Sequence, residues 1–357
     1  MDAGNERQRE PERETMADPA TSPSGPSRQG RGLLIGGAIA LGLLFLTVGA
    51  IVLVLVAGPG GGRGGGGSAA APETFQEKYV SGEGADKIAV LPLVGTIGSE
   101  GSTSVGTPAA TPETLRNQLR QADEDESVKA IVLEINSPGG GVVASDQMHQ
   151  SIQDFKEKTK KPVVVSMDET AASGGYYVAT AADEIVANPG TFTGSLGTII
   201  SILNYKETEQ KLGLEEEVFK SDEFKDLFSG SRERTPEERE IIQNLINEDY
   251  DRFVEVIVEG RNLPEDRVRE LADGRVYSGR QAESLGLVDE LGDLEKAAEI
   301  SKELAGVEKA TVVRYQRTPS LVELLQARLA PSKPEALEVL EAVGLSPTPE
   351  PQYLYRP

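Results

Sequence analysis

The sequence predicts an α/β fold with mostly parallel strands. Residues 130–136 (AIVLEIN) and 161–167 (KPVVVSM) are short runs rich in β-branched residues. Each run ends near a cluster of glycines, and each cluster is followed by a stretch with helical character. Repeated strand–helix order is typical of a parallel sheet whose faces are covered by helices.

The remaining elements follow from local patterns. Residues 88–97 predict a first strand pair or hairpin. Thr111-Pro112 predicts a helix start, because proline is favoured at the first helical position, and this helix runs to about Ala122. Further expected elements are helices at 142–155 and 176–182, a strand at 184–189, a long helix from Thr235 to Glu259, helices at 266–272, 278–285 and 297–304, and a last strand at 311–315.

Composition limits the classes of function. The 357 residues allow one domain with extensions, or two domains. Acidic residues outnumber basic ones by 58 to 36, and the net charge of −22 argues against nucleic acid as a partner. There is no cysteine, hence no disulfide, and a single histidine without cysteines disfavours a zinc site. We therefore expect no cofactor.

The N-terminal region predicts a membrane anchor. Residues 1–32 are polar and expected to be a disordered tail, whereas residues 33–57 carry no charge and no proline. The apolar run is long enough to cross a bilayer and longer than the core of a signal peptide. A cleaved signal peptide and a buried core helix are the alternatives, and a retained transmembrane helix fits better.

Charges flanking the apolar run suggest its orientation. Arg28 and Arg31 precede the run and Arg63 follows it, which slightly favours a cytoplasmic N-terminus and an extracytoplasmic main domain. The expected domain bounds are a glycine-rich linker at 58–86, the main domain at 87–315 and a flexible C-terminal tail at 316–357. Residues 352–355 of this tail could dock onto the sheet or onto an active groove.

Ser173 lies at a predicted strand-to-helix turn and is followed by Gly174 and Gly175. Its hydroxyl and the first N–H groups of the helix would face the same small volume, as acyl transfer requires. Ser173 could equally be a simple N-cap of the helix. The glycines at 139–141 could likewise form a tight turn, or present backbone N–H groups to an oxyanion.

A serine nucleophile needs a base. The single histidine, His149, falls inside the predicted helix at 142–155, where a surface position is expected. A neutral lysine is the remaining common base, and burial favours the neutral form of an amine. Composition alone does not choose among the lysines.

Five motifs occur in order along the chain. They are residues 136–140 (NSPGG), 171–177 (AASGGYY), 193–197 (TGSLG), 224–226 (FKD) and 273–279 (DGRVYSG). Together they resemble the bacterial signal peptide peptidase SppA family, in its short single-domain form. The resemblance covers residues 87–304 and implies the fold shared by Clp protease and crotonases, built of repeated β-β-α units.

The resemblance also implies a serine protease with a Ser/Lys dyad. It assigns Ser173 as the nucleophile and Lys225 as the general base. It assigns the backbone N–H groups of Gly140 and Gly174 as the oxyanion hole, and the hydroxyl of Ser195 as a hydrogen-bond partner of the base. In the family the two dyad residues come from neighbouring subunits of a homo-oligomeric dome on the membrane, so that an isolated monomer should be inactive.

The resemblance implies remnant signal peptides and other apolar peptides as substrates. The apolar run at 197–203, with Tyr176 and Tyr177, could line a peptide groove or belong to the core. Two other functions compete with the peptidase hypothesis. One is a crotonase-like acyl-CoA enzyme, which also uses N–H donors from glycine turns, and the other is a catalytically inactive membrane scaffold.

Overall fold

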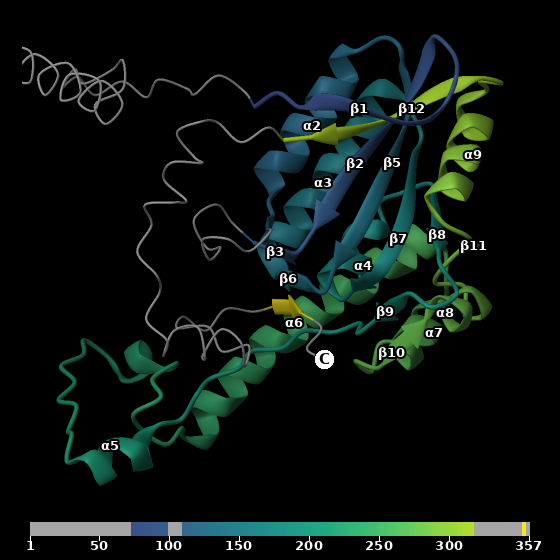
Figure 1. Ribbon diagram of the computed structural model, residues 1–357. Helices are drawn as coiled ribbons and strands as arrows, with labels where there is room; N and C mark the ends of the chain where they lie inside the picture. The colour runs from purple at the N-terminus through teal and green to yellow at the C-terminus, as the bar shows by residue number, and fades with distance from the viewer. Residues whose placement is uncertain (1–72, 99–108, 318–351, 355–357) are drawn as a thin grey trace, which may run out of the picture. The chain divides into compact units, whose positions relative to one another are not determined.

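A nine-stranded sheet forms the centre of the protein (Figure 1). The computed structural model describes residues 73–98, 109–317 and 352–354. The strand order is β1-β12-β2-β5-β7-β8-β11, with β9 paired to β7 and β10 to β9. Pairing is parallel from β12 to β11 and antiparallel at β1 and β10, which confirms the mostly parallel α/β fold. The strands are β1 (Gln76–Gly82), β2 (Asp86–Val94), β5 (Val128–Ser137), β7 (Val163–Ala172), β8 (Glu184–Ala187), β9 (Phe192–Gly194), β10 (Val276–Ser278), β11 (Glu290–Leu291) and β12 (Ala310–Gln316).

A second, small sheet adjoins the carboxyl ends of β2 and β5. Its order is β13-β6-β3-β4. The strands are β3 (Thr96–Ile97), β4 (Ala109–Ala110), β6 (Gly139–Gly141) and β13 (Gln352–Leu354). Because β3 follows β2 and β6 follows β5 after very short connections, the small sheet extends the end of the large one.

Helices cover both faces of the main sheet. Ala89 and Leu91 of β2 belong to one buried cluster, whereas Ile88 and Val90 belong to the other. Successive strand residues point to opposite faces, so continuous apolar runs are what a strand buried on both faces requires. The helices are α2 (Pro112–Glu124), α3 (Val142–Thr159), α4 (Gly174–Ala179), α5 (Lys206–Leu212), α6 (Pro236–Arg261), α7 (Glu265–Leu271), α8 (Gly279–Ser284) and α9 (Leu294–Ala305), with a short 3₁₀ helix, η1 (Glu223–Asp226).

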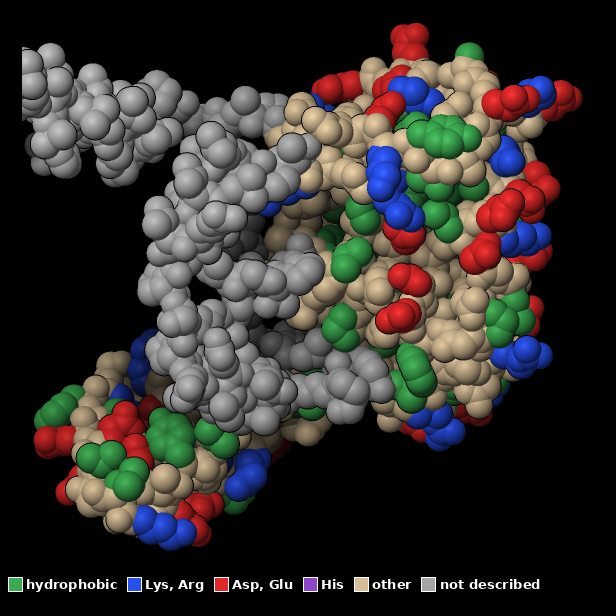
Figure 2. Space-filling model, viewed as in Figure 1, with side chains coloured by type: hydrophobic (Ala, Val, Ile, Leu, Met, Phe, Trp, Pro, Cys, Tyr) green, Lys and Arg blue, Asp and Glu red, His purple; other side chains and the backbone are tan. Residues whose placement is uncertain are grey.

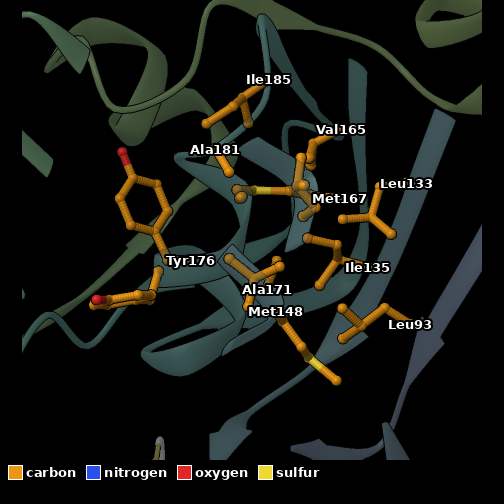
Figure 3. Close-up of a cluster of buried hydrophobic side chains, with 14 of the residues drawn as sticks. Leu93, Leu133, Ile135, Met148, Val165, Met167, Ala171, Tyr176, Ala181 and Ile185 are labelled. Carbon is orange, nitrogen blue, oxygen red and sulfur yellow. The ribbon is translucent and has the colours of Figure 1, made fainter. Parts of the chain in front are cut away.

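The larger cluster lies against α3 and α4. Figure 3 shows Met148 of α3 and Tyr176 of α4 among side chains from the sheet, including Ile135 and Met167. Tyr176 and Tyr177 are fully buried, and the Tyr176 hydroxyl donates to the Leu287 carbonyl at 2.8 Å. These two tyrosines are therefore core residues and not the lining of a groove. They anchor the short helix that follows Ser173.

Two helix starts are confirmed in detail. Thr111 caps α2 with its side chain, and Pro112 is its first residue. Thr235 caps α6 in a full capping box, in which the Thr235 hydroxyl accepts from the Glu238 N–H and the Glu238 carboxylate accepts from the Thr235 N–H. Such boxes satisfy backbone donors that have no intrahelical partner. The start of α6 is thus fixed by its own sequence.

Two expectations at the start of the domain were wrong. Residues 76–82, expected within the linker, form the edge strand β1, which pairs with β12 through its backbone although all seven of its residues are exposed. Residues 88–97 do not form a hairpin, because β2 pairs with β5 and β12 while β3 belongs to the small sheet. The C-terminal residues 352–354 do dock on the sheet, as β13 against β6.

The surface position expected for His149 was also wrong. Its exposed fraction is 3%, and its ring lies edge-on to Tyr177 with the ring centroids 5.4 Å apart. The helical face that contains His149 also carries Met148, Ile152 and Phe155, all of them buried. This residue is part of the core and does not touch the Ser173 hydroxyl, which makes no hydrogen bond to any described residue.

Burial makes His149 a source of pH-dependent stability. Burial lowers the pKa of His149 from 6.5 to about 4, against the opposing charge of Asp146. Between these pH values the unfolded chain binds a proton that the folded chain does not, so the free energy of unfolding falls on acidification. At about 1.36 kcal/mol per pKa unit the loss reaches ~3 kcal/mol. Urea unfolding at pH 7 and pH 4.5 should show this loss, and His149→Gln should reduce it; an identical pH slope in both proteins would contradict the assignment.

The apolar run at 33–57 lies outside the described residues. Within the described ranges, no helix is both long enough and apolar enough to cross a membrane. The described residues all belong to one unit, Ala69–Pro357.

Candidate active site

Ser173 occupies a strained turn between β7 and α4. Its backbone has φ 53° and ψ −116°, a conformation that costs a non-glycine residue on the order of 1–3 kcal/mol. Although Ser173 stands at the N-cap position, its side chain makes no capping hydrogen bond. The residue is 1% exposed, and its Oγ has no hydrogen-bond partner among the described residues. The simple N-cap hypothesis is therefore wrong, and the geometry is that of a serine held for attack at a strand-to-helix turn.

Backbone hydrogen bonds hold this turn from the neighbouring strand. The Ser173 N–H donates to the Gly194 carbonyl at 2.8 Å, and the Thr193 hydroxyl donates to the Ala171 carbonyl at 2.6 Å. These contacts join segments that are distant in the chain and were not predicted. The relevant signal was the pair of motifs at 193–197 and 273–279, which the structure joins as the antiparallel strands β9 and β10.

Ser195 follows directly after the contact with Ser173. It also has a positive φ of 50°, and its N–H donates to the Arg275 carbonyl at 2.7 Å. Gly194 has φ +83°, and a Cβ built there would lie 2.6 Å from the ring of Tyr277. Ser195 thus lies beside the Ser173 turn, on a backbone that is hydrogen-bonded to the residue before β10.

The two glycine turns meet at the carboxyl end of the sheet. Ser137 of β5 pairs with Ala171 of β7, so the chain enters β6 next to the Ser173 turn. A Cβ on Gly175 would lie 2.9 Å from the Ser137 carbonyl oxygen. Gly174 is the first residue of α4, and the first N–H groups of a helix have no intrahelical acceptor. The structure therefore brings Ser173, Gly174 and the start of β6 together.

Gly140 is the central residue of β6. It faces Ile97 of β3 on one side and Tyr353 of β13 on the other. A Cβ at Gly140 would lie 1.9 Å from the Ile97 carbonyl oxygen, so no other residue fits without moving the backbone. The strand is also held at Gly139, whose N–H donates to the Ser137 hydroxyl at 3.1 Å. β6 is a short strand, and its edge opposite β3 pairs with the extended residues of β13.

Lys225 lies on a different part of the chain. It is an exposed residue of η1, within residues 197–235 between β9 and α6, here called the arm. Neither α5 nor η1 contains a buried residue, and the run at 197–203 forms no strand. The Lys225 amine has no ion-pair or hydrogen-bond partner among the described residues. The hollow beside it is lined by arm residues such as Tyr205 and Phe224. Because Ser173 Oγ has no hydrogen-bond partner among the described residues, Lys225 and Ser173 of one chain are not hydrogen-bonded.

Comparisons with known proteins agree with these motifs. The sequence profile of Peptidase family S49 matches residues 155–308, and that of Clp protease matches residues 104–189. A provisionally named signal peptide peptidase SppA of Enterococcus faecium is 36% identical over 293 residues, which cover 79% of this chain and 85% of that protein. The chloroplastic serine protease SPPA of Arabidopsis thaliana is 36% identical over 249 residues, 68% of this chain and 36% of that protein.

A further relative supports the same assignment. A provisionally named protease of Synechocystis is 40% identical over 222 residues, 62% of this chain and 76% of that protein. All three relatives are proteases by name, which confirms the endopeptidase prediction over the acyl-CoA alternative. With a serine at a strained turn, glycine strands beside it and these relatives, the chain belongs to peptidase family S49, the SppA family of serine endopeptidases.

Proposed function

We propose that Ser173 and Lys225 form the catalytic dyad across two neighbouring subunits of a homo-oligomer. One observation carries this proposal. The Ser173 hydroxyl and the Lys225 amine each lack a partner among the described residues of their own chain, and the arm holds Lys225 on an exposed element. A nucleophile activated by a base needs the two groups within hydrogen-bond reach. A second copy of the chain supplies what one copy does not.

In this proposal Lys225 acts first as a base and then as an acid. Neutral Lys225 of one subunit removes the proton from Ser173 Oγ of the next, and Oγ attacks the peptide carbonyl. The N–H groups of Gly140 and Gly174 bind the resulting oxyanion. Lys225 gives its proton to the leaving amine, and water, activated by the same lysine, releases the acyl group. The hydroxyl of Ser195 orients the amine of Lys225.

The arm offers an apolar surface for such a partner. Its exposed fractions reach 86% at Phe219, 67% at Leu212 and 60% at Leu214. Figure 2 shows hydrophobic side chains gathered on this lobe of the molecule. Large apolar side chains that cluster on a surface are typical of an interaction site. We take a second copy of this chain as the partner, with the arm reaching toward its Ser173.

Substrate binds, in this proposal, as an added strand on β6. The antiparallel pairing of β13 with β6 supports the idea that this edge accepts an extended backbone. Residues 33–57 would anchor the chain in the membrane with the N-terminus in the cytoplasm and the peptidase domain outside. Remnant signal peptides, which the name of the Enterococcus faecium relative suggests, are then apolar substrates within reach.

A substrate comparison tests this proposal. In this proposal the substrate is an apolar peptide that binds as an added strand on β6. The full chain should therefore cleave a synthetic signal peptide much faster than a polar peptide of the same length. Both peptides carry a fluorophore and a quencher, and the cleavage products are identified by mass. Equal cleavage of the two peptides would contradict the substrate assignment while leaving the peptidase activity intact.

The oxyanion role of Gly140 predicts a large effect of one methyl group. In Gly140→Ala the new Cβ must displace the backbone of Ile97, which moves the N–H donor, so kcat should fall by about 10²–10³-fold. Gly141→Ala is the matched control. Its Cβ would meet nothing closer than the Cβ of Ala144 at 3.9 Å, and kcat should stay near the wild-type value. Equal kcat values for the two variants would contradict this role of Gly140.

Pairing of β13 with β6 predicts competition with substrate. A chain that ends at Glu350 lacks β13, so its KM should be several-fold lower while kcat is unchanged. A chain that ends at Leu354 keeps the strand and serves as the control. Identical KM values for the two truncated chains and the full chain would show that β13 does not occupy the substrate edge.

A further inference from the structure

The helix that carries Lys225 is held by very little hydrophobic packing. η1 contains no buried residue, and Phe224, next to Lys225, is 37% exposed. A catalytic group must stay within a fraction of an ångström of its productive position, because a misplacement of 1 Å costs about 10²-fold in rate. Some other interaction must therefore fix this helix.

An ion pair fixes the residue after Lys225. The Asp226 carboxylate accepts hydrogen bonds from Arg232 Nε at 2.8 Å and from Arg232 Nη2 at 2.7 Å, one on each oxygen. It also accepts from Lys220 Nζ at 2.8 Å. The hydrogen bonds from Arg232 and Lys220 hold the pKa of Asp226 well below its usual range. A two-point pair of this kind sets both the distance and the plane of the carboxylate.

The same guanidinium also binds the first turn of α6. Arg232 Nη1 donates to Glu238 Oε2 at 2.9 Å, and Arg232 Nη2 donates to Glu238 Oε1. The Glu238 side chain is 2% exposed and also accepts from the Thr235 N–H at 2.8 Å. Hydrogen bonds from Arg232 lower the pKa of Glu238 to about 2, so the carboxylate stays charged.

The far end of α6 is part of the core. Phe253, Val254 and Ile257 are each no more than 1% exposed, whereas the first half of the helix carries exposed residues such as Leu245. α6 is a single helix of 26 residues whose hydrogen-bonded backbone runs from Pro236 to Arg261 without a break. The buried end of α6 therefore fixes where Glu238 lies. The hydrogen bonds of Arg232 to both Glu238 and Asp226 then fix where Asp226 lies.

We propose that Arg232 is the positioning residue for the general base: by binding Asp226 and Glu238 at once, it fixes η1 to α6 and so places Lys225 against the Ser173 of the neighbouring subunit. This inference rests on the proposed function, in which Lys225 is the base. Within one chain, the hydrogen bonds of Arg232 go to Asp226, Glu233 and Glu238 and not to Ser173. Its contribution should appear in kcat and in the reactivity of Ser173, and it should be absent from KM, because the substrate edge at β6 lies elsewhere.

The test uses the full chain with Arg232→Lys, which keeps the charge but loses the second branch of the fork. We expect kcat to fall at least ~10-fold with KM unchanged, and labelling of Ser173 by a fluorophosphonate probe to slow by a similar factor. Arg239→Lys is the control. Arg239 is an exposed arginine next to Glu238 in α6, and the variant should match the wild type in kcat and KM. An unchanged kcat, or a change confined to KM, would overturn the proposal.

Mixed oligomers separate positioning from general weakening of the fold. Arg232→Lys is placed either in the Ser173→Ala chain, which supplies Lys225, or in the Lys225→Met chain, which supplies Ser173. Activity should fall only in the first mixture, and equal losses in both would overturn the proposal. If the mixture of Ser173→Ala and Lys225→Met chains without Arg232→Lys is inactive, the dyad is not shared between subunits. The proposal for Arg232 is then tested by the kcat and KM of the protein in which every subunit carries Arg232→Lys.

A second variant covers the case in which Arg232→Lys does not assemble. Asp226→Asn keeps the size of the side chain and removes the charge that Arg232 binds on η1, while the pair between Arg232 and Glu238 stays in place. It should also lower kcat without a change in KM. A wild-type kcat in an assembled Asp226→Asn protein would then count against the proposal.

Discussion

Ser173→Ala should reduce kcat/KM by about 10⁴–10⁶-fold and leave the fold unchanged. The loss is large because attack, acyl-enzyme formation and hydrolysis all pass through Oγ. The fold should survive because Oγ makes no hydrogen bond to any described residue, so its removal leaves no described group without a partner. Peptide hydrolysis, fluorophosphonate labelling and thermal unfolding measure the three consequences.

A buried serine elsewhere provides the control for this change. Ser301 of α9 is fully buried and donates to the carbonyl of Ala297, which belongs to the cluster on the other face of the sheet from α4, at 2.8 Å. Ser301→Ala should cost some stability and leave kcat/KM near the wild-type value. Full activity in Ser173→Ala would show that another residue is the nucleophile.

Lys225→Met should be almost as damaging, with a fall in kcat of about 10⁴-fold or more. Methionine keeps most of the length and apolar volume of the side chain and removes the amine. Since Lys225 is exposed and its amine has no partner among the described residues, the isolated chain should unfold at the same temperature as the wild type. The measurement is kcat on the same peptide, with the oligomer size recorded for each protein.

Lys211→Met is the matched control on the arm. Its side chain is 77% exposed on α5, and its ion pair with Glu207 is long, at 3.9 Å. Removing this charge should change neither kcat nor assembly. If Lys225→Met assembled normally and kept the activity of the Lys211→Met control, the base would have to be another group.

The central strands were predictable because burial leaves a clear pattern. β2, β5 and β7 are apolar on both faces, and the caps at Thr111 and Thr235 have strong local preferences. β1 could not be found in this way. All of its residues are exposed, and it is a strand only because its backbone pairs with β12, more than 200 residues later in the chain.

The site was predictable in part for the same reason. The Ser173 turn follows from a buried strand, two glycines and an apolar helix, whereas its strained φ and its contact with Gly194 depend on pairing between distant segments. The place of Lys225 could not be read from the residues, because the arm buries few of them, and its role came from the resemblance. The buried position of His149 depends on its helical face, where Met148 and Ile152 are also buried, and a single histidine within a helix does not by itself indicate it.

Mixing the two inactive variants tests the central claim most directly. Ser173→Ala and Lys225→Met full chains are purified, combined in equal amounts under conditions that exchange subunits, and assayed on the apolar peptide. If the dyad is shared, about one in four head-to-tail interfaces pairs an intact Ser173 with an intact Lys225, and a corresponding fraction of wild-type activity should return. If subunits exchange and the mixture stays as inactive as its components, the dyad is not built across the interface.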